Sequence, residues 1–263
     1  MNDSRTGLIY LVGLGPGSNG NLTPSARDAL GKSDSIIGFH TYVEQITDLV
    51  QDKELISMEL GQEIERAERA VDMANTGKTV AVVSSGDAGI YGMSGPVFKV
   101  LCDRNWDGIS PGLETIPGIS ALQSSAALLG SPLMQDFCAV SLSDLMTPWQ
   151  TICRRIEAAA WGDFVIVLYN PRSMRRTQQL LEARQIIMNH REASTPVGLV
   201  KDAFRIKQQV TLTNLGDLEQ ASEQINMVTT VVIGNSTTYI HNGHMVTPRG
   251  YGDSAIPANR RYS

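Results

Sequence analysis

Short apolar runs rich in β-branched residues alternate with helical patterns along most of this chain. The runs are Leu8–Val12, Ser35–Gly38, Thr79–Ser84 and Glu114–Ile116 in the first half, and Phe164–Tyr169, Pro196–Val200 and Val228–Ile233 in the second. Their near-continuous hydrophobicity indicates strands that are buried on both faces. Because strands and helices alternate, the sequence predicts an α/β fold with mostly parallel sheets.

Proline and glycine mark several helix and turn boundaries. Thr23-Pro24 and Gly95-Pro96 each place proline at the first position of a predicted helix. The segment Glu63–Asn75 has an amphipathic helical pattern and is interpreted as scaffold. Near the end, Asn242-Gly243 lies between apolar, alternating flanks, which predicts a type I′ hairpin.

A chain of 263 residues is long enough for two α/β domains. Around Ile116-Pro-Gly-Ile-Ser120 it leaves the first set of strands, and a small apolar helix, Ala121–Leu129, follows. We therefore expect an N-terminal domain over residues 1–117, a C-terminal domain over residues 118–252, and a polar tail over residues 253–263.

Charge, apolar length and cysteine spacing exclude several classes of function. A net charge of -5 gives no global basic field, which argues against nucleic acid as the partner. No apolar stretch approaches the ~20 residues of a membrane span, and the first residues do not have the pattern of a signal peptide. Cys102, Cys138 and Cys153 lie far apart, so we expect no metal site, and we interpret them as reduced core thiols of a cytoplasmic protein.

The glycine-rich segment "LVGLGPGS" follows the first apolar run directly and invites comparison with phosphate-binding loops. Its glycines fall as G-x-G-x-G at Gly13, Gly15 and Gly17, whereas a dinucleotide fingerprint needs G-x-G-x-x-G and a carboxylate after the second strand. Pro16 removes one N–H donor, and no G-K-[ST] follows. The loop therefore does not predict a phosphate cradle; the alternative is a buried strand that turns tightly against a neighbour.

An acid among glycines, Asp87, follows a strand that we expect at the centre of a sheet. In open parallel sheets ligands bind at the carboxyl edge, so Asp87 in "SSGDAGIYG" is a candidate for binding a ligand amine or hydroxyl. Alternatively it caps the helix that starts near Pro96, with help from Ser94. The turn Pro117-Gly-Ile-Ser120 is a second candidate, whose alternative is a simple serine N-cap.

Three arginines follow the predicted strand that ends at Tyr169. Asn170 is expected to cap a helix that begins at Pro171, with Arg172, Arg175 and Arg176 in its first two turns. Cations oppose the helix dipole there, so an acidic ligand explains them better, although a solvated face is the alternative. Lys201, Arg205 and Arg249 also follow strand ends and, if they converge with these arginines, form a pocket for several carboxylates.

The histidines and serines supply no catalytic motif. His241 and His244 flank the predicted hairpin turn, and solvent exposure explains them better than a metal site. No G-x-S-x-G elbow is present, so hydrolase chemistry has no support.

Taken together, six segments resemble the tetrapyrrole (precorrin) methylase family, the class III S-adenosylmethionine (SAM)-dependent methyltransferases. They are "VGLGPGS", "VVSSGDAGIYGM", "PGIS", "LYNPRSMRR", "IGNSTT" and "MVTPRGY", and the resemblance spans roughly residues 7–252. With "GFHTYV" added, they are most similar to members that methylate C17 of precorrin-3B or its cobalt form in cobalamin biosynthesis. Many members carry an acid where this chain has Ser18.

The resemblance implies two α/β domains with SAM between them, S-adenosylhomocysteine as product, and a homodimer. It implies SAM contacts from three places: Pro16 in the glycine loop; Gly86, Asp87 and Ile90 after the central strand; and Ser120, Ala121 and Tyr169 further along the chain. The substrate is then a tetrapyrrole with several carboxylates, for which Arg172, Arg175, Arg176, Lys201 and Arg249 are the candidate contacts.

The resemblance further implies ring contraction, in which the meso carbon C20 is extruded with help from its oxygen substituent. That step needs proton transfer, for which His40, Tyr42, Ser85 and Tyr91 are candidates at strand ends. The alternatives are another precorrin methyltransferase, a non-catalytic tetrapyrrole- or nucleotide-binding protein on the same scaffold, and, third, a nicotinamide oxidoreductase.

Overall fold

A computed structural model describes residues 6–250 of the chain. The chain divides into two compact units, Met1–Ala121 and Leu122–Ser263, and each is described by itself. The division comes four residues after the boundary that we expected between residues 117 and 118. The expected polar tail, residues 253–263, and Tyr251 of the "MVTPRGY" segment lie outside the described residues.

The first unit is built on a five-stranded sheet with the order β3-β2-β4-β1-β5. Its strands are β1 (Leu8–Gly13), β2 (Ser35–Phe39), β3 (Glu54–Met58), β4 (Thr79–Ser84) and β5 (Gly112–Ile116), and every pair is parallel. The carboxyl ends of all of its strands therefore lie along one edge. Strand β3 was not expected, because its burial alternates and only Ile56 is buried.

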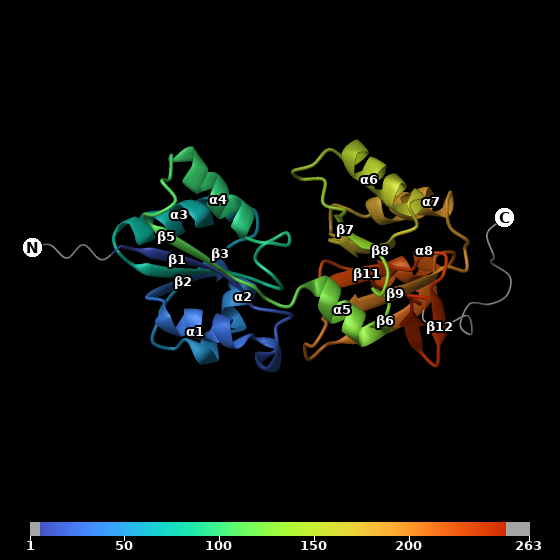
Figure 1. The fold of residues 1–263 in the computed structure, drawn as a ribbon, viewed down its shortest axis with the longest axis horizontal. Coiled ribbons are helices and arrows are strands. Elements are labelled where there is room, and N and C mark those ends of the chain that lie inside the picture. The colour runs from blue at the N-terminus through green and yellow to red at the C-terminus, as the bar shows by residue number, and fades with distance from the viewer. Residues whose placement is uncertain (1–5, 251–263) are drawn as a thin grey trace, which may run out of the picture. The chain divides into compact units, whose positions relative to one another are not determined.

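Helices cover both faces of this sheet (Figure 1). On one face, α1 (Pro24–Lys32) and α2 (His40–Glu44) pack against Val12, Ile36 and Val83. On the other, α3 (Glu63–Asn75) and α4 (Ser94–Asp103) pack against Leu11, Ile37 and Val82. Because side chains alternate between the two faces of a strand, these cores explain the continuous apolar runs.

The structure confirms most of the expected elements of this unit. Strands β1, β2 and β4 are buried along nearly their whole length. Helix α1 begins at Pro24, and the Thr23 hydroxyl accepts a hydrogen bond from Ala26 N at 3.1 Å. The expected start of α4 at Pro96 is wrong: that helix begins at Ser94, with Met93 as its N-cap.

The second unit contains a five-stranded sheet with the order β10-β9-β11-β8-β7. Its strands are β7 (Phe137–Ser141), β8 (Val165–Tyr169), β9 (Pro196–Lys201), β10 (Gln209–Asn214) and β11 (Thr229–Ile233). Only β7 and β8 pair in parallel, whereas β11 is antiparallel to both of its neighbours and β10 is antiparallel to β9. Over all described strands, parallel pairs still outnumber antiparallel ones. The second sheet, however, is not built from the successive parallel βαβ units that the sequence predicted.

Helices α6 (Trp149–Trp161) and α7 (Gln179–Met188) pack on one face of this second sheet (Figure 1). Helix α5 (Ala121–Leu129) and Met245 pack on the other face. The short helix α8 (Leu218–Ala221) lies between β10 and β11 in the sequence. Three-residue 3₁₀ turns occur at Asn19–Asn21, Thr47–Leu49 and Ser222–Gln224.

The expected hairpin is confirmed. Strands β12 (Tyr239–His241) and β13 (His244–Val246) are antiparallel, and β13 also pairs with β6 (Gly130–Ser131). Asn242 and Gly243 both have positive φ, 46° and 76°, as a type I′ turn requires.

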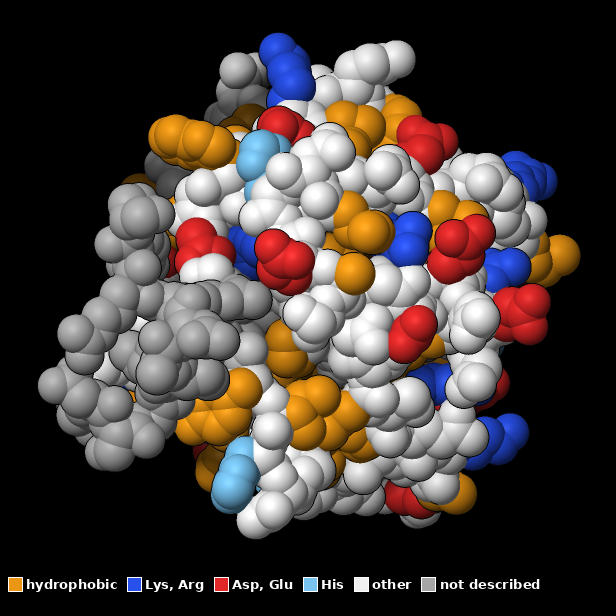
Figure 2. Space-filling view, turned by 90° about the vertical axis from the view of Figure 1, so that its right-hand side faces the viewer, with side chains coloured by type: hydrophobic (Ala, Val, Ile, Leu, Met, Phe, Trp, Pro, Cys, Tyr) orange, Lys and Arg blue, Asp and Glu red, His pale blue; other side chains and the backbone are white. Residues whose placement is uncertain are grey.

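Other sequence expectations concern the surface and the thiols. On the face drawn in Figure 2, acidic and basic side chains are interspersed, and no continuous basic patch is seen there. Among the described residues, no helix is both long enough and apolar enough to cross a membrane. All three cysteines are free; Cys138 and Cys153 are half-buried, but Cys102 is exposed, so its expected place in the core is wrong.

Candidate functional site

The carboxyl edge of the first sheet gathers most of the residues singled out from the sequence. Strands β1 and β4 are neighbours, and the helices that follow them, α1 and α4, pack on opposite faces of the sheet. In open α/β sheets this arrangement marks the place where ligands bind. The loops that leave β1, β4 and β5 here carry Pro16, Asp87 and Ser120, respectively.

The loop after β1 is joined to the loop after β4 through their backbones. Gly15 and Gly86 form an antiparallel bridge, in which Gly15 N donates to Gly86 O at 3.0 Å and Gly86 N donates to Gly15 O at 2.7 Å. Both have positive φ, 71° and 69°, which favours glycine. These two glycines therefore serve backbone pairing between the two loops.

The loop after β5 packs against the same bridge. A Cβ on Gly118 would lie 2.1 Å from Gly86 O, and a Cβ on Gly13 would lie 2.7 Å from Gly118 N. Both contacts are with backbone atoms, which cannot move aside easily. Three loops that are distant in the sequence thus meet without intervening side chains.

Asp87 fixes this arrangement with both of its carboxylate oxygens. Oδ1 accepts from Gly89 N at 2.8 Å, and Oδ2 accepts from Gly118 N at 2.9 Å. Asp87 does not cap α4, so that alternative is wrong. Because a carboxylate oxygen has more than one acceptor site, these bonds leave capacity for a ligand donor.

The other proposed cofactor residues of this unit, and the proton-transfer candidate Tyr91, lie on or directly after the loops that leave β1, β4 and β5. Pro16 is buried, whereas Ile90 and Tyr91 on the β4 loop are 36% and 55% exposed. Tyr91 holds a φ of 56°, which is rare for an aromatic residue and often accompanies a functional site. Ser120 is buried at the end of the β5 loop. Ser18 accepts from Asn21 Nδ2 at 2.7 Å and so stabilises the glycine loop locally.

A polar cluster adjoins this group on β2 and β3. His40 begins α2 directly after β2, and its Nδ1 lies 3.6 Å from Oε2 of Glu59, which follows β3. The His40 and Tyr42 rings both contact Phe39 edge-on. Arg66, 3% exposed on α3, donates to Glu59 O at 2.8 Å and to Met93 Sδ at 3.3 Å. Burial lowers the pKa of Arg66, and the nearby Glu63 and Tyr42 oppose that shift.

In the second unit, Tyr169 ends β8 and its hydroxyl accepts from Leu122 N at 2.9 Å. Leu122 lies in the first turn of α5, where backbone N–H groups have no partner within the helix. Tyr169 therefore caps this helix with a side chain from a distant strand. Ala121, the first residue of α5, is half-buried.

The expected helix at Pro171 is wrong. Residues 171–178 form an irregular segment, and α7 begins only at Gln179. Asn170 adopts a φ of 51° and donates to Ser141 Oγ at 3.0 Å, so it turns the chain and does not cap a helix. Arg176 is buried and donates through Nε to Asn170 O at 3.0 Å, which gives it a structural explanation.

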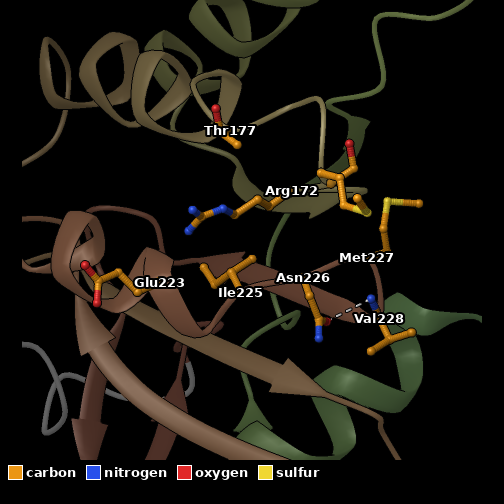
Figure 3. Close-up of a pocket in the computed structure, with 9 residues that line it drawn as sticks. Arg172, Thr177, Glu223, Ile225, Asn226, Met227 and Val228 are labelled. Atoms are coloured by element: carbon orange, nitrogen blue, oxygen red, sulfur yellow. Dashed lines mark hydrogen bonds between the residues drawn. The ribbon is translucent and has the colours of Figure 1, made fainter.

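An open pocket of about 490 Å³ lies beside this segment (Figure 3). The side chains of Arg172, Ile225 and Met227 line it, together with Ser173, Met174, Thr177, Glu223, Asn226 and Val228. Arg172 also donates to Ser222 O. The pocket thus combines one guanidinium, Arg172, and one carboxylate, Glu223, with thioether and aliphatic groups.

Not all of the expected cations come together. Lys201 ends β9 and pairs with Thr229, the residue after the pocket segment, so it lies at the same sheet edge as Arg172. Arg175 is exposed in the irregular segment, and Arg205 lies 3.8 Å from Asp202 in the loop after β9. Arg249 instead donates to Met134 O, close to the amino end of β7. That is the opposite edge of the sheet, so Arg249 does not converge with the others.

The hairpin histidines bond locally. His241 Nε2 contacts Asn242 Nδ2, and His244 Nδ1 contacts Asn242 O, at 3.2 and 3.0 Å. Over residues 6–250, no group of three metal-ligating side chains is found.

Glu59 and Arg66 were not among the residues predicted from the sequence. The amphipathic pattern of Glu63–Asn75 contained a usable signal, because Arg66 lies four residues before Ala70 and so falls on the apolar face. An arginine is almost never fully buried unless its guanidinium is paired, so its place on the apolar face of this helix indicates a polar partner. Glu59 lies in a segment without periodicity, and nothing in the sequence distinguishes it.

Comparison with known proteins supports the resemblance. The family model for tetrapyrrole (corrin/porphyrin) methylases matches residues 8–219. A cobalt-factor III methyltransferase of Priestia megaterium is 51% identical over 248 residues, which are 93% of this chain but 45% of that longer protein. A probable cobalt-factor III C(17)-methyltransferase of Salmonella typhimurium is 43% identical over 244 residues, 93% of this chain and 99% of that protein.

A solved methyltransferase structure is also similar in fold to this chain. The crystal structure of the methyltransferase CobJ superposes with a TM-score of 0.87 at 32% identity, and covers 92% of this chain and 100% of that one. The overall fold of this chain is therefore similar to that of a solved methyltransferase. By the match of its family model and by these relatives, the chain belongs to the tetrapyrrole (corrin/porphyrin) methylase family.

Proposed function

We propose that this chain is a SAM-dependent methyltransferase that methylates C17 of a precorrin-3B-type macrocycle and contracts its ring in cobalamin biosynthesis. The observation that carries the proposal is 43% identity over almost the whole length of a relative named a cobalt-factor III C(17)-methyltransferase. The names of the relatives favour the cobalt-loaded macrocycle over the metal-free one.

When bound, SAM supplies an electrophilic methyl group. The electron pair for the new C–C bond comes from the macrocycle, and the pair of the broken C–S bond stays on sulfur. The protein therefore needs no strong nucleophile; it must align two reactants and exclude water. Alignment alone can lower such a barrier by ~7–11 kcal/mol.

The backbone of the first unit supports a binding site for a ligand the size of SAM, because its loops meet without side chains between them. The Gly15–Gly86 bridge keeps side chains out of the space where the three loops meet, while Asp87 retains acceptor capacity beside them. We assign the cofactor contacts of this unit to Pro16, Gly86, Asp87, Ile90, Ser120 and Ala121. In the second unit we assign Tyr169.

The substrate contacts are proposed in the second unit. Arg172 lines the pocket, and Lys201 shares its sheet edge, so these two are the leading partners for carboxylates of the macrocycle. Arg175 is exposed in the same segment. Arg176 and Arg249 remain predictions from the sequence. Arg176 donates a hydrogen bond to Asn170 O, and Arg249 lies at the opposite edge of the second sheet, where it donates to Met134 O.

The test is calorimetry with SAM, followed by incubation with metal-free and cobalt-loaded macrocycle and mass spectrometry of the products. We expect SAM to bind, and one S-adenosylhomocysteine to form for each macrocycle methylated at C17, with faster turnover of the cobalt form. Stoichiometric macrocycle binding without S-adenosylhomocysteine would instead identify a non-catalytic binding protein. Full activity in a variant with Asp87→Ala, Pro16→Ala and Tyr169→Ala would contradict the assigned cofactor site.

We further propose that the protein is a cytoplasmic homodimer, as the resemblance implies. Light scattering on the purified full chain measures its mass in solution, and a monomer would contradict the dimer. Cell fractionation tests the location.

A further inference from the structure

Four candidates for proton transfer, His40, Tyr42, Ser85 and Tyr91, lie at one sheet edge, and the structure distinguishes one of them. A proton acceptor needs an accessible basic atom together with a neighbour that orients it and stabilises the charge it gains. His40 has a carboxylate neighbour, Glu59, at 3.6 Å from its Nδ1. The two tyrosines and the serine are poor bases in their neutral forms.

The two ring nitrogens of His40 are in different surroundings. Nδ1 is buried and has no hydrogen-bond partner, so the Glu59 carboxylate at 3.6 Å is the charged group that it faces. The side chain as a whole is 42% exposed. An Nδ1–H directed at a carboxylate leaves Nε2 with the lone pair, the tautomer that a base requires.

The main chain of Glu59 is held at two atoms, while its side chain is 76% exposed. Its N donates to Gln62 Oε1 at 2.9 Å, and its O accepts from Nη2 of the buried Arg66 at 2.8 Å. Arg66 Nη1 also reaches Met93 Sδ at the end of the β4 loop that carries Asp87. Arg66 thus links the residue beside His40 to the loop proposed to hold the cofactor.

The placement of His40 suits this role. Strand β2 lies next to β4, so His40 emerges beside the loop of Gly86 and Asp87, on the side away from β1. The same sheet edge therefore divides into a glycine-lined part at β1, β4 and β5 and a polar part at β2 and β3.

We propose that His40 accepts the substrate proton in ring contraction, and that Glu59, whose main-chain carbonyl accepts from Arg66, acts as its positioning residue. This inference rests on the proposed function. In the step, the O–H bond at the carbon to be extruded breaks and leaves its electron pair on oxygen. The proton bonds to the Nε2 lone pair, and the imidazolium formed faces Glu59.

The first test needs no substrate. The chain has four histidines, so the His40 ring signals can be assigned by NMR as those missing in His40→Gln. Ring-nitrogen shifts then report which nitrogen of the neutral His40 carries the proton. We expect the proton on Nδ1 in the parent, and a more even mixture of the two tautomers in Glu59→Gln, because an amide attracts the Nδ1–H less than a carboxylate does.

The second test separates the two chemical steps by single turnover. We expect His40→Gln to bind SAM as the parent does but to contract the ring ~100-fold more slowly. Glu59→Gln should slow contraction ~3- to 10-fold without changing SAM affinity, with Glu59→Asp intermediate. Glu68→Gln, an exposed carboxylate on α3, is the matched control and should behave as the parent.

The outcomes are distinguishable. An unchanged His40 tautomer and an unchanged contraction rate in Glu59→Gln would overturn the positioning role of Glu59. Parent-like ring contraction in His40→Gln would overturn the role of His40. Absence of SAM binding and of S-adenosylhomocysteine in the parent would instead count against the proposed function, and the NMR tautomer measurement would still report on the pair.

Discussion

The Asp87 carboxylate accepts a hydrogen bond from Gly118 N at 2.9 Å, and so joins the loop after β4 to the loop after β5. The bond is charge-assisted and lies next to the bridge between Gly15 and Gly86. One side chain thus couples the geometry of the proposed cofactor site to the stability of the unit that contains it.

Replacing Asp87 by Asn should affect both properties. The amide keeps one acceptor oxygen for two backbone donors and loses the charge, so we expect unfolding free energy to fall by ~1–2 kcal/mol. SAM affinity should fall at least tenfold. Chemical denaturation and calorimetry on the same sample measure the two effects. Unchanged SAM affinity in a destabilised variant would show that Asp87 is only structural.

Substitution of Gly118 tests the close approach of the loops. A Cβ there would lie 2.1 Å from Gly86 O, so Gly118→Ala should destabilise the first unit by ~2–4 kcal/mol. Gly95→Ala is the matched control, since it lies in α4 with nothing within 4 Å and should be neutral or slightly stabilising. Thermal unfolding compares the pair, and equal melting temperatures would contradict the packing described.

Tyr169→Phe removes the hydroxyl that accepts from Leu122 N at the start of α5. We expect a loss of ~0.5–1.5 kcal/mol in unfolding free energy, the usual cost of one neutral hydrogen bond. Hydrogen exchange should accelerate at Leu122 and not at the end of α5. Tyr239→Phe, on a hairpin strand, serves as the control for loss of a tyrosine hydroxyl.

Burial raises the pKa of the Cys138 thiol from 9.0 to about 11, and Arg191 opposes the shift only partly. In the unfolded chain the thiol loses its proton near pH 9, whereas the folded protein retains it. The unfolded state therefore binds fewer protons above that pH, and this group's contribution to stability is present below pH 9 and lost as the pH rises towards 11.

In Cys138→Ala, the free energy of unfolding should decrease less steeply between pH 9 and pH 11 than in the parent. Denaturant unfolding at several pH values measures the slope, with Cys102→Ala as the control because Cys102 is exposed. At pH 8, iodoacetamide should label Cys102 well before Cys138. Faster labelling of Cys138 would contradict its raised pKa.

Arg172→Gln should weaken substrate binding more than turnover. The guanidinium lines the pocket, and loss of one charge-assisted contact to a carboxylate is worth ~1.5–3 kcal/mol. We expect KM to rise at least tenfold with little change in SAM affinity. Arg155→Gln, on the exposed side of α6, is the control. A parent-like KM in Arg172→Gln would remove Arg172 from the substrate site.

The first sheet was predictable from sequence to a useful degree, for a physical reason. Strands β1, β2 and β4 are buried on both faces, so their apolar runs are unambiguous. The edge strand β5 exposes Glu114 and Thr115, and β3 and β10 are half-exposed, so their patterns are weak or absent. Strand direction in the second sheet depends on long-range pairing that no local pattern encodes.

Individual residues of the candidate site could be predicted from the sequence, but the hydrogen bonds that join its loops could not. Glycines and an acid after strands pointed to the right edge, but the bond from Gly118 to Asp87 joins residues 31 apart in the sequence. Pro171 suggested a helix, since proline suits a first turn. The left-handed turn at Asn170 and the bond from Arg176 to Asn170 O instead hold that segment irregular, and both are tertiary features.

The main-chain bridge between Gly15 and Gly86 also limits how the proposed binding edge can be altered. Because backbone atoms form it, no side-chain exchange can enlarge or reshape it without breaking the bridge. Substitutions that change ligand selectivity must therefore be made at side chains that project from the two bridged loops, such as the exposed Ile90 and Tyr91. A designer who seeks a variant for another sulfonium analogue should randomise these two positions and leave the glycines untouched.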